Sequence, residues 1–220
     1  MAEVTKSYNE QAQAYDDFIR KLVPDYEVFH ELLPKYLGQV TTAFDVGCGT
    51  GNTSLRLLES NPNLKLTCLD TSPQMLEVTK CKLGDRHIFT ESSIENYEPA
   101  GDFEAVVSVM VMHNIQDKSD RLKTYKKIAD CLTGVGTYLT VDIFRGETEQ
   151  LQDIYMAQWR DFMLNNLPES EVDGKWLKLH KEKDKPLKLS EQIRLLKKAG
   201  FSTVDVVHKR LQFAMLFAQK

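Results

Sequence analysis

The residues of this chain best suited to chemistry lie in a glycine-rich segment, Phe44 to Asn52. It reads Phe-Asp-Val-Gly-Cys-Gly-Thr-Gly-Asn, and a short β-branched and aromatic run, Thr41 to Val46, leads into it. Such glycines turn the backbone sharply without Cβ clashes and let N–H groups approach a ligand. The spacing is Gly-x-Gly-x-Gly, which differs from the Gly-x-Gly-x-x-Gly of dinucleotide-binding folds, and no Gly-Lys-Ser/Thr phosphate loop occurs. The segment predicts a ligand cradle.

Asp70 is the second residue that points to a ligand. It ends a predicted strand, Leu64 to Leu69, and follows Gly51 by nineteen residues. In a doubly wound sheet the carboxyl ends of the first two strands lie side by side, so a carboxylate there can accept both hydroxyls of a ribose. Taken singly, the glycines could form only a tight turn, and Asp70 could be only an acid near a helix. Together they predict a nucleoside site.

The elements that position these residues alternate between strand-like and helix-like patterns. Strands are expected at Thr41 to Val46, Leu64 to Leu69, His87 to Thr90, Ala105 to Val109 and Thr137 to Phe144. Helices are expected around Leu55 to Leu58, after the capping pair Ser72-Pro73, from Ser119 to Leu132 and from Ser190 to Ala199. The alternation predicts a parallel sheet with helices on both faces. Two closely spaced strands, Thr203 to Val207 and Leu211 to Ala218, predict an antiparallel hairpin.

The whole chain, residues 1–220, is expected to form one domain of four segments. Residues 1–40 hold two amphipathic helices and are expected to act as a lid, residues 41–145 form the ligand-binding core, and residues 189–220 form the last helix and the hairpin. Residues 146–188 are too long for a simple connection and are expected to be an insertion on the substrate side, over the sheet edge. Its first half is helical by pattern, and its lysine-rich second half is expected to be a solvated, flexible loop.

Composition narrows the class of partner. A net charge of −4 does not favour non-specific nucleic-acid binding, so a small molecule is the expected partner. No apolar run is long enough to span a membrane, no signal peptide is evident, and a cytoplasmic location is expected. The cysteines form no CxxC pair and are expected to be reduced, and no histidines share a ligand spacing, so no metal site is predicted.

Several segments of the chain fit one known pattern: Asp45 to Gly51, Leu69 to Leu76, Phe103 to Ser108 with Met112 to Ile115, and Lys198 to Phe201. In them the chain resembles the class I S-adenosylmethionine-dependent methyltransferases, closely over residues 40–145 and more loosely at both ends. The resemblance implies a Rossmann-like α/β fold, with a seven-stranded, mostly parallel sheet, helices on both faces and an antiparallel strand in the C-terminal hairpin. It also implies S-adenosyl-L-methionine as the cofactor.

The resemblance carries specific roles onto this sequence by position. It implies that Gly47 and Gly49 approach the methionine part of the cofactor, that Asp70 holds the ribose and that Met75 lies against the adenine. Residues 108–110 would face the amino group and the methyl. The full set of implied cofactor-binding residues is Asp45, Gly47, Cys48, Gly49, Gly51, Asp70, Thr71, Met75, Ser92, Ser93, Ser108, Val109 and Tyr15.

The chain departs from the family pattern in three places. After the third strand, where many members have an acid that contacts the adenine amine, it reads Glu91-Ser92-Ser93-Ile94, so Glu91 or Ser92 must serve or the contact is absent. The turn before the fifth strand is Gly134-Val135-Gly136. The region around Tyr15 and the C-terminal segment also resemble the carboxy-S-adenosylmethionine synthases. No arginine lies in residues 176–188 to bind the extra carboxylate of that cofactor, so ordinary S-adenosylmethionine is favoured.

Methyl transfer from a sulfonium needs alignment and exclusion of water rather than a covalent intermediate. His113 follows the fourth strand, near the expected methyl position, and could act as a general base or simply fix its loop by hydrogen bonds. Acceptor binding is assigned to Tyr8, His113, Tyr155, Trp159 and Trp176, although aromatic residues at helical spacing also suit a core.

The expected function is therefore methyl transfer to a small-molecule acceptor, by a monomer or homodimer. The lysines of residues 175–188 keep an RNA methyltransferase as an alternative. A carboxy-S-adenosylmethionine synthase-like enzyme and a non-catalytic cofactor-binding module are the other two. A nicotinamide-dependent dehydrogenase is disfavoured by the glycine spacing.

Overall fold

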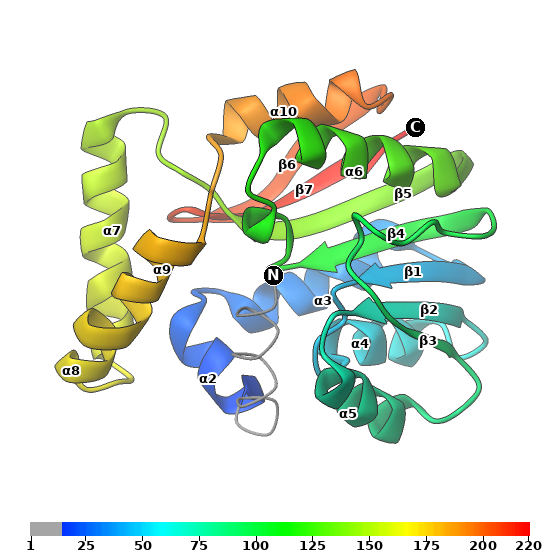
Figure 1. Cartoon of the computed structure of the whole chain (residues 1–220), viewed down its shortest axis with the longest axis horizontal. Coiled ribbons are helices and arrows are strands. Elements are labelled where there is room, and N and C mark those ends of the chain that lie inside the picture. The colour runs from blue at the N-terminus through cyan, green and yellow to red at the C-terminus, as the bar shows by residue number, and fades with distance from the viewer. Residues whose placement is uncertain (1–14) are drawn as a thin grey trace.

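A seven-stranded sheet in the order β3-β2-β1-β4-β5-β7-β6 forms the centre of the computed structural model, which describes residues 15–220 (Figure 1). The strands are β1 Thr42–Val46, β2 Lys65–Asp70, β3 Ile88–Glu91, β4 Phe103–Val109, β5 Leu132–Ile143, β6 Thr203–Arg210 and β7 Phe213–Gln219. β7 pairs antiparallel with β5 and with β6, and the other pairs are parallel. The predicted Rossmann-like sheet and its C-terminal hairpin are confirmed.

Helices cover both faces of the sheet, as a mostly parallel sheet requires. They are α2 Tyr15–Leu22, α3 Tyr26–Leu37, α4 Asn52–Ser60, α5 Pro73–Leu83, η1 Met112–Asn114, α6 Lys118–Cys131, α7 Glu149–Leu164, α8 Glu169–Glu171, η2 Val172–Trp176, α9 Leu177–Lys183 and α10 Leu189–Lys198. Leu33 of α3 and Leu57 of α4 belong to the core on one face. Tyr125 of α6 and Leu196 of α10 belong to the core on the other.

The sequence signals for helix and strand ends are found close to where they were expected. Ser72 caps α5, since its hydroxyl accepts a hydrogen bond from the Met75 N–H at 3.2 Å, and Pro73 occupies the first turn. The main difference is β5, which begins at Leu132 rather than Thr137. Leu132 pairs with Phe103, and an irregularity in the register follows before Thr137 pairs with Ala105. The glycines of residues 134–136 thus form an irregular extension of the strand.

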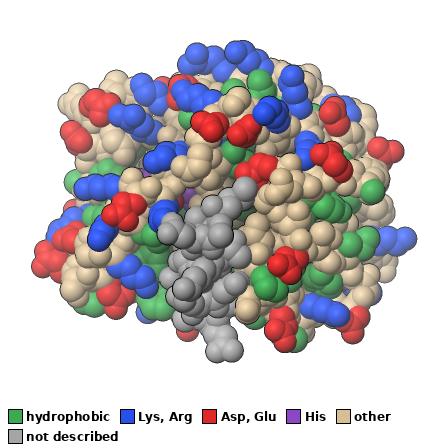
Figure 2. Space-filling model, in the orientation of Figure 1, with side chains coloured by type: hydrophobic (Ala, Val, Ile, Leu, Met, Phe, Trp, Pro, Cys, Tyr) green, Lys and Arg blue, Asp and Glu red, His purple; other side chains and the backbone are tan. Residues whose placement is uncertain are grey.

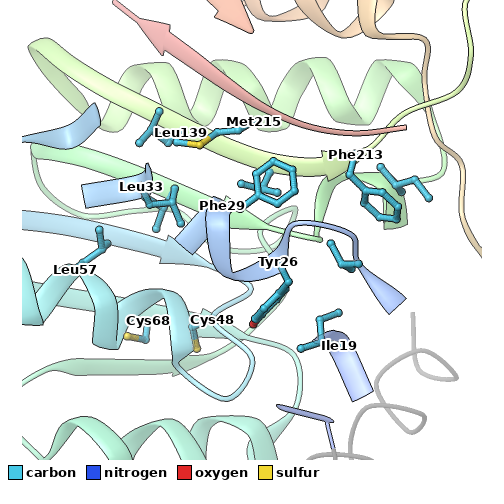
Figure 3. Close-up of a cluster of buried hydrophobic side chains, with 14 of the residues drawn as sticks. Ile19, Tyr26, Phe29, Leu33, Cys48, Leu57, Cys68, Leu139, Phe213 and Met215 are labelled. Carbon is cyan, nitrogen blue, oxygen red and sulfur yellow. The ribbon is translucent and has the colours of Figure 1, made fainter. Parts of the chain in front are cut away.

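Only part of the predicted lid lies over the strand ends. Phe29 and Leu33 of α3 are 1% and 0% exposed, and Figure 3 shows them in one cluster with Leu139 of β5 and Met215 of β7. The helix α3 therefore covers the sheet as a core element, because its apolar stripe is buried there. Tyr8 lies outside the described residues.

The second half of the insertion differs from its prediction. The lysine-rich segment expected to be a flexible loop contains α8, η2 and α9. Val172 is fully buried, and Trp176 packs on Phe18 of α2 with ring centroids 6.0 Å apart. The Arg160 guanidinium donates to Asp173 at 2.7 Å and to Glu169 at 2.6 Å, which ties the segment to α7. Apolar anchors between the lysines order this segment, and a count of charges alone does not reveal them.

Candidate functional site

A cavity of about 360 Å³ opens at the carboxyl ends of β1, β2 and β4. This is where open α/β sheets bind ligands. The predicted cofactor residues that line it are Tyr15, Gly47, Gly49, Asp70, Thr71, Met75, Ser92, Ser93 and Val109. Most of the residues predicted from two separate motifs are thus brought together around one hollow.

The glycine loop is drawn onto the end of β2 by hydrogen bonds. The N–H groups of Gly47 and Cys48 both donate to the Leu69 carbonyl, at 2.7 and 2.9 Å. The Gly49 N–H donates to Asp70 Oδ2 at 2.8 Å, and the Ser72 N–H donates to Asp70 Oδ1 at 2.9 Å. Asp70 therefore faces the loop, which is the arrangement that the sequence predicts.

Asp70 keeps capacity for a ligand. Each of its oxygens accepts one backbone bond, and a carboxylate offers about four acceptor positions. Burial raises the pKa of Asp70 above its ordinary value, although the N–H groups of Ser72 and Gly49 oppose that rise. Two ligand hydroxyls would supply further donors to the ionised form, as a ribose does.

A narrow apolar slot follows β3. Met75 and Ile94 are 2% and 4% exposed and line the cavity with Ser92 and Ser93. The Ser93 hydroxyl is buried and has no hydrogen-bond partner among residues 15–220, a state that costs free energy unless a ligand satisfies it. Of the two residues considered for an adenine contact, Ser92 lines the cavity and Glu91 does not.

Three other predicted cofactor residues lie beneath the loop and do not line the cavity. Asp45 is 1% exposed and accepts a hydrogen bond from the Ser54 hydroxyl at 2.7 Å, and burial raises its pKa to about 7. The Cys48 sulfur lies 4.0 Å from the Thr79 hydroxyl. A Cβ on Gly51 would meet the Thr79 methyl at 2.9 Å. These residues shape the loop from below.

Ser108 also points away from the cavity. Its hydroxyl lies 2.7 Å from the Tyr138 hydroxyl and donates to Thr140 at 3.0 Å. Successive side chains of a strand point to opposite faces, so Val109 reaches the cavity and Ser108 does not. The resemblance placed residues 108–110 at the site as a block, whereas alternation along β4 separates them.

His113 is buried beside the cavity rather than on its wall. Its Nδ1 lies 2.5 Å from Asp142 Oδ1, its N–H donates to Asp142 Oδ2 at 3.0 Å, and its Nε2 lies 3.8 Å from Asp184. Burial alone would lower the pKa of His113, but the two carboxylates outweigh it and raise the pKa above 6.5. Both ring nitrogens thus face carboxylates, which matches the loop-fixing alternative. The neighbours Asn114, Ile115 and Gln116 line the cavity instead.

The aromatic residues assigned to the acceptor do not gather at the cavity. The Trp159 ring N–H donates to the Leu22 carbonyl at 2.6 Å, and the ring packs on Phe213 in the core. The Tyr155 hydroxyl accepts from Lys209 at 3.0 Å, and Trp176 packs on Phe18. None of the three lines the cavity.

Several lining residues were missed by sequence reasoning, among them Met110, Val111, Glu182 and Lys183. Met110 and Val111 follow β4 directly, so the strand end was the available signal. Glu182 and Lys183 lie in the lysine run, but only the packing of α9 brings them to the site.

A polar cluster ties α2 to the glycine loop. Asp16 accepts hydrogen bonds from the Thr50 hydroxyl and from the Asn52 side chain, the latter at 2.9 Å. Lys82 donates to Asp16 at 3.1 Å and to Asn52 at 2.7 Å. Burial opposes ionisation of Asp16, but these bonds and the Lys82 charge outweigh it and lower its pKa. Tyr15, next in the chain, lines the cavity.

Replacing Asp16 with alanine should therefore loosen both the loop and Tyr15. We expect the affinity for a cavity ligand to fall by about 1–2 kcal/mol, because three polar partners lose their acceptor. Since its pKa is lowered, the wild-type contribution of Asp16 should persist at neutral pH and disappear only as the pH falls through that lowered pKa, below 3.8. Calorimetry measures the affinity. Asp17→Ala is the matched control, since Asp17 is exposed on the same helix; equal losses in both variants would contradict the tether.

Within the described residues, no group of three or more His, Cys, Asp or Glu side chains is placed to hold a metal ion. No helix among residues 15–220 is both long and apolar enough to cross a bilayer.

Comparison with known proteins shows where similar chains are found. The family model described as a methyltransferase domain matches residues 44–138. A carboxy-S-adenosyl-L-methionine synthase of Nautilia profundicola is 28% identical over 219 residues, which covers 96% of this chain and 92% of that protein. A malonyl-[acyl-carrier protein] O-methyltransferase of Ilyobacter polytropus is 33% identical over 121 residues, which covers 52% of this chain and 43% of that protein.

Solved structures share the fold. An O-methyltransferase family protein from Burkholderia thailandensis superposes with a TM-score of 0.67 at 15% identity, covering 98% of this chain and 59% of its own. Human N-acetylserotonin methyltransferase, solved in complex with S-adenosylmethionine, gives a TM-score of 0.60 at 14% identity, covering 100% of this chain and 56% of its own. This chain thus spans less than two thirds of either structure, and the likeness concerns architecture.

Proposed function

The chain belongs to the class I S-adenosylmethionine-dependent methyltransferases, and from this premise we propose that it transfers the methyl group to a small-molecule acceptor by direct in-line displacement. The observation that carries the proposal is the pairing of Asp70 with the glycine loop on one cavity. The cavity volume of about 360 Å³ falls within the range of small-ligand sites.

The cavity fits the cofactor at each end. A Cβ built on Gly49 would meet nothing within 4 Å, so the loop leaves open space for the methionine part. Asp70 is placed for the ribose hydroxyls. Met75 and Ile94 would hold the adenine, and the unpartnered Ser93 hydroxyl would satisfy one of its nitrogens. We propose these as the principal cofactor-binding residues.

S-Adenosylmethionine supplies a methyl group on a sulfonium, which leaves as a neutral thioether. The protein's part is then to align the acceptor and to exclude water. Tyr15 from α2 and Lys183 from α9 line the cavity from outside the sheet, and they would close it over the bound cofactor. Met110, in the left-handed conformation at a φ of 58°, is held by its N–H bond to Val141 at 2.8 Å.

The acceptor end of the cavity favours a small polar molecule. Its wall there carries Asn114, Gln116, Glu182 and Lys183, a mixture of amides and opposite charges. On the face shown in Figure 2, basic and acidic side chains are interspersed, without the single broad basic patch that RNA binding favours. Both observations support a small-molecule acceptor over RNA.

A second candidate is an enzyme like the carboxy-S-adenosylmethionine synthases, because such a protein matches almost the whole chain. Lys183 on the cavity wall offers a cation for an added carboxylate. If this candidate is right, carboxy-S-adenosylmethionine should bind more tightly than S-adenosylmethionine, and Lys183→Met should remove the difference while Lys181→Met, an exposed control on α9, should not. Equal affinities in the wild type would reject it.

Two measurements test the main proposal. Calorimetry should show saturable binding of S-adenosylmethionine and of its demethylated product to the folded protein; absence of both would defeat the proposal. Incubation with methyl-labelled cofactor and a panel of alcohols, carboxylic acids, amines and thiols should then give a labelled product. Tight binding without transfer to any acceptor would instead indicate a cofactor-binding module.

We also propose that the protein acts in the cytoplasm. The support is that Cys48, Cys68, Cys81 and Cys131 are all free thiols, as expected in a reducing compartment.

A further inference from the structure

A row of buried charged side chains joins α9 to the end of β5. His113 lies between two carboxylates, 2.5 Å from Asp142 and 3.8 Å from Asp184, and the Asp184 carboxylate lies 2.7 Å from His180. The side chains of His113 and Asp142 are 6% and 3% exposed, and that of Asp184 is 19% exposed. Asp142 belongs to β5 and His113 to η1, whereas Asp184 follows α9. The row therefore crosses from the core to the insertion.

Backbone and side-chain hydrogen bonds reinforce the same junction. The Lys185 N–H donates to the His113 carbonyl at 2.9 Å, and the Gln116 side chain donates to the Lys183 carbonyl at 3.2 Å. The buried Arg121 guanidinium of α6 donates to the Ile115 and Lys185 carbonyls at 2.6 and 2.9 Å. Residues 183–185 are thereby held against the segment after η1.

This junction is also part of the cavity wall. Glu182 and Lys183 line the cavity from one side of it, and Asn114 and Gln116 line it from the other. If the junction opens, α9 can move away and the wall is breached. Retention of a bound cofactor should therefore depend on the same contacts that hold α9.

The charges at the junction need one more cation. Asp142 from β5 and Asp184 beside α9 bring two carboxylates, whereas Arg121 from α6 brings one fixed positive charge. His113 and His180 are the remaining titratable groups that face the two carboxylates. A buried charge without a partner is strongly unfavourable, and His113 is the histidine that lies between both carboxylates.

We propose that His113 is a positioning residue: as an imidazolium between Asp142 and Asp184, it holds α9 and residues 183–185 closed over the cavity, and its deprotonation releases them. This inference rests on the proposed function only for the identity of the ligand that the closed wall retains.

The direction of the pH effect follows from the geometry and its electrostatics. The carboxylates raise the pKa of His113 above 6.5, so its contribution is complete at lower pH and is lost as the pH rises through the raised pKa. The closed state should therefore be favoured in mildly acidic and neutral buffer and weakened in alkaline buffer.

The test measures two quantities between about pH 6 and pH 9, the range in which a histidine with a raised pKa titrates. The first is the dissociation rate of S-adenosylhomocysteine, and the second is amide hydrogen exchange of residues 177–185 in the protein without ligand. Exchange rates are corrected for their intrinsic pH dependence. In the wild type, both should rise with pH, the dissociation rate by about fivefold or more.

Asp184→Asn keeps the core pair of His113 and Asp142 and removes the charge on the α9 side. We expect fast dissociation and fast exchange at every pH in this variant, and the same for His113→Gln if it folds. Lys178→Gln, an exposed change on α9, should keep the wild-type profile. A wild-type profile in Asp184→Asn would overturn the proposal. If the wild type binds no S-adenosylhomocysteine, the proposed function fails, and the exchange data still decide whether the junction opens with pH.

Discussion

Replacing Asp70 with alanine should raise the dissociation constant for S-adenosylmethionine roughly 100-fold, a loss of about 3 kcal/mol. Two contributions add. The ribose hydroxyls would lose a charged acceptor, and the Gly49 N–H, held by Asp70 at 2.8 Å, would lose the bond that positions the loop. Isothermal titration of the wild type and the variant measures the change directly.

The control for Asp70→Ala removes a carboxylate of the same type far from the loop. Asp85, whose side chain is 85% exposed and pairs with Lys80, serves this purpose. Asp85→Ala should leave the dissociation constant unchanged. A change of less than about threefold in Asp70→Ala, well under the loss expected for charged hydrogen bonds, would remove Asp70 from the proposed site.

Gly47→Ala should both destabilise the fold and abolish cofactor binding. Gly47 has a φ of 70°, and an added Cβ would lie 2.4 Å from Val111 Cγ2. The left-handed backbone costs about 1–2 kcal/mol for alanine, and the overlap costs about 1–3 kcal/mol more. Urea unfolding measures the stability, and calorimetry measures the binding.

Two further variants separate the causes. Gly84 has a φ of 82° but nothing within 4 Å of an added Cβ, so Gly84→Ala should show only the backbone cost. Val111→Ala in the Gly47→Ala background removes the clashing methyl groups and should restore part of the lost stability. If the double variant is no more stable than Gly47→Ala, the overlap with Val111 is not the cause.

The sequence allowed the sheet and its ligand edge to be predicted because the information there is local. Alternating strand and helix patterns, the Ser72-Pro73 cap and the short link before β7 each act over a few residues. Gly47 and Asp70 could be paired in advance because the topology of a doubly wound sheet fixes which strand ends are neighbours.

The remaining site residues could not be predicted because they depend on packing between distant segments. Nothing near Lys183 in the chain shows that it will line a cavity with Gly47. The roles of His113 and Trp159 depended on what surrounds them, and each found partners far along the chain: Asp142 and Asp184 for the histidine, and the Leu22 carbonyl for the tryptophan. Ser108 was misplaced because a family pattern assigns a strand end as a block, whereas the pleat decides side chain by side chain.

The position of β7 has a consequence for how the protein is made. β6 precedes β7 in the chain, yet β7 lies between β5 and β6 and pairs with both. During synthesis, β5 and β6 must leave the ribosome as open edges, which are prone to association with other nascent chains. The sheet can close only after Phe213 to Gln219 has emerged, so the final step of translation completes this half of the molecule.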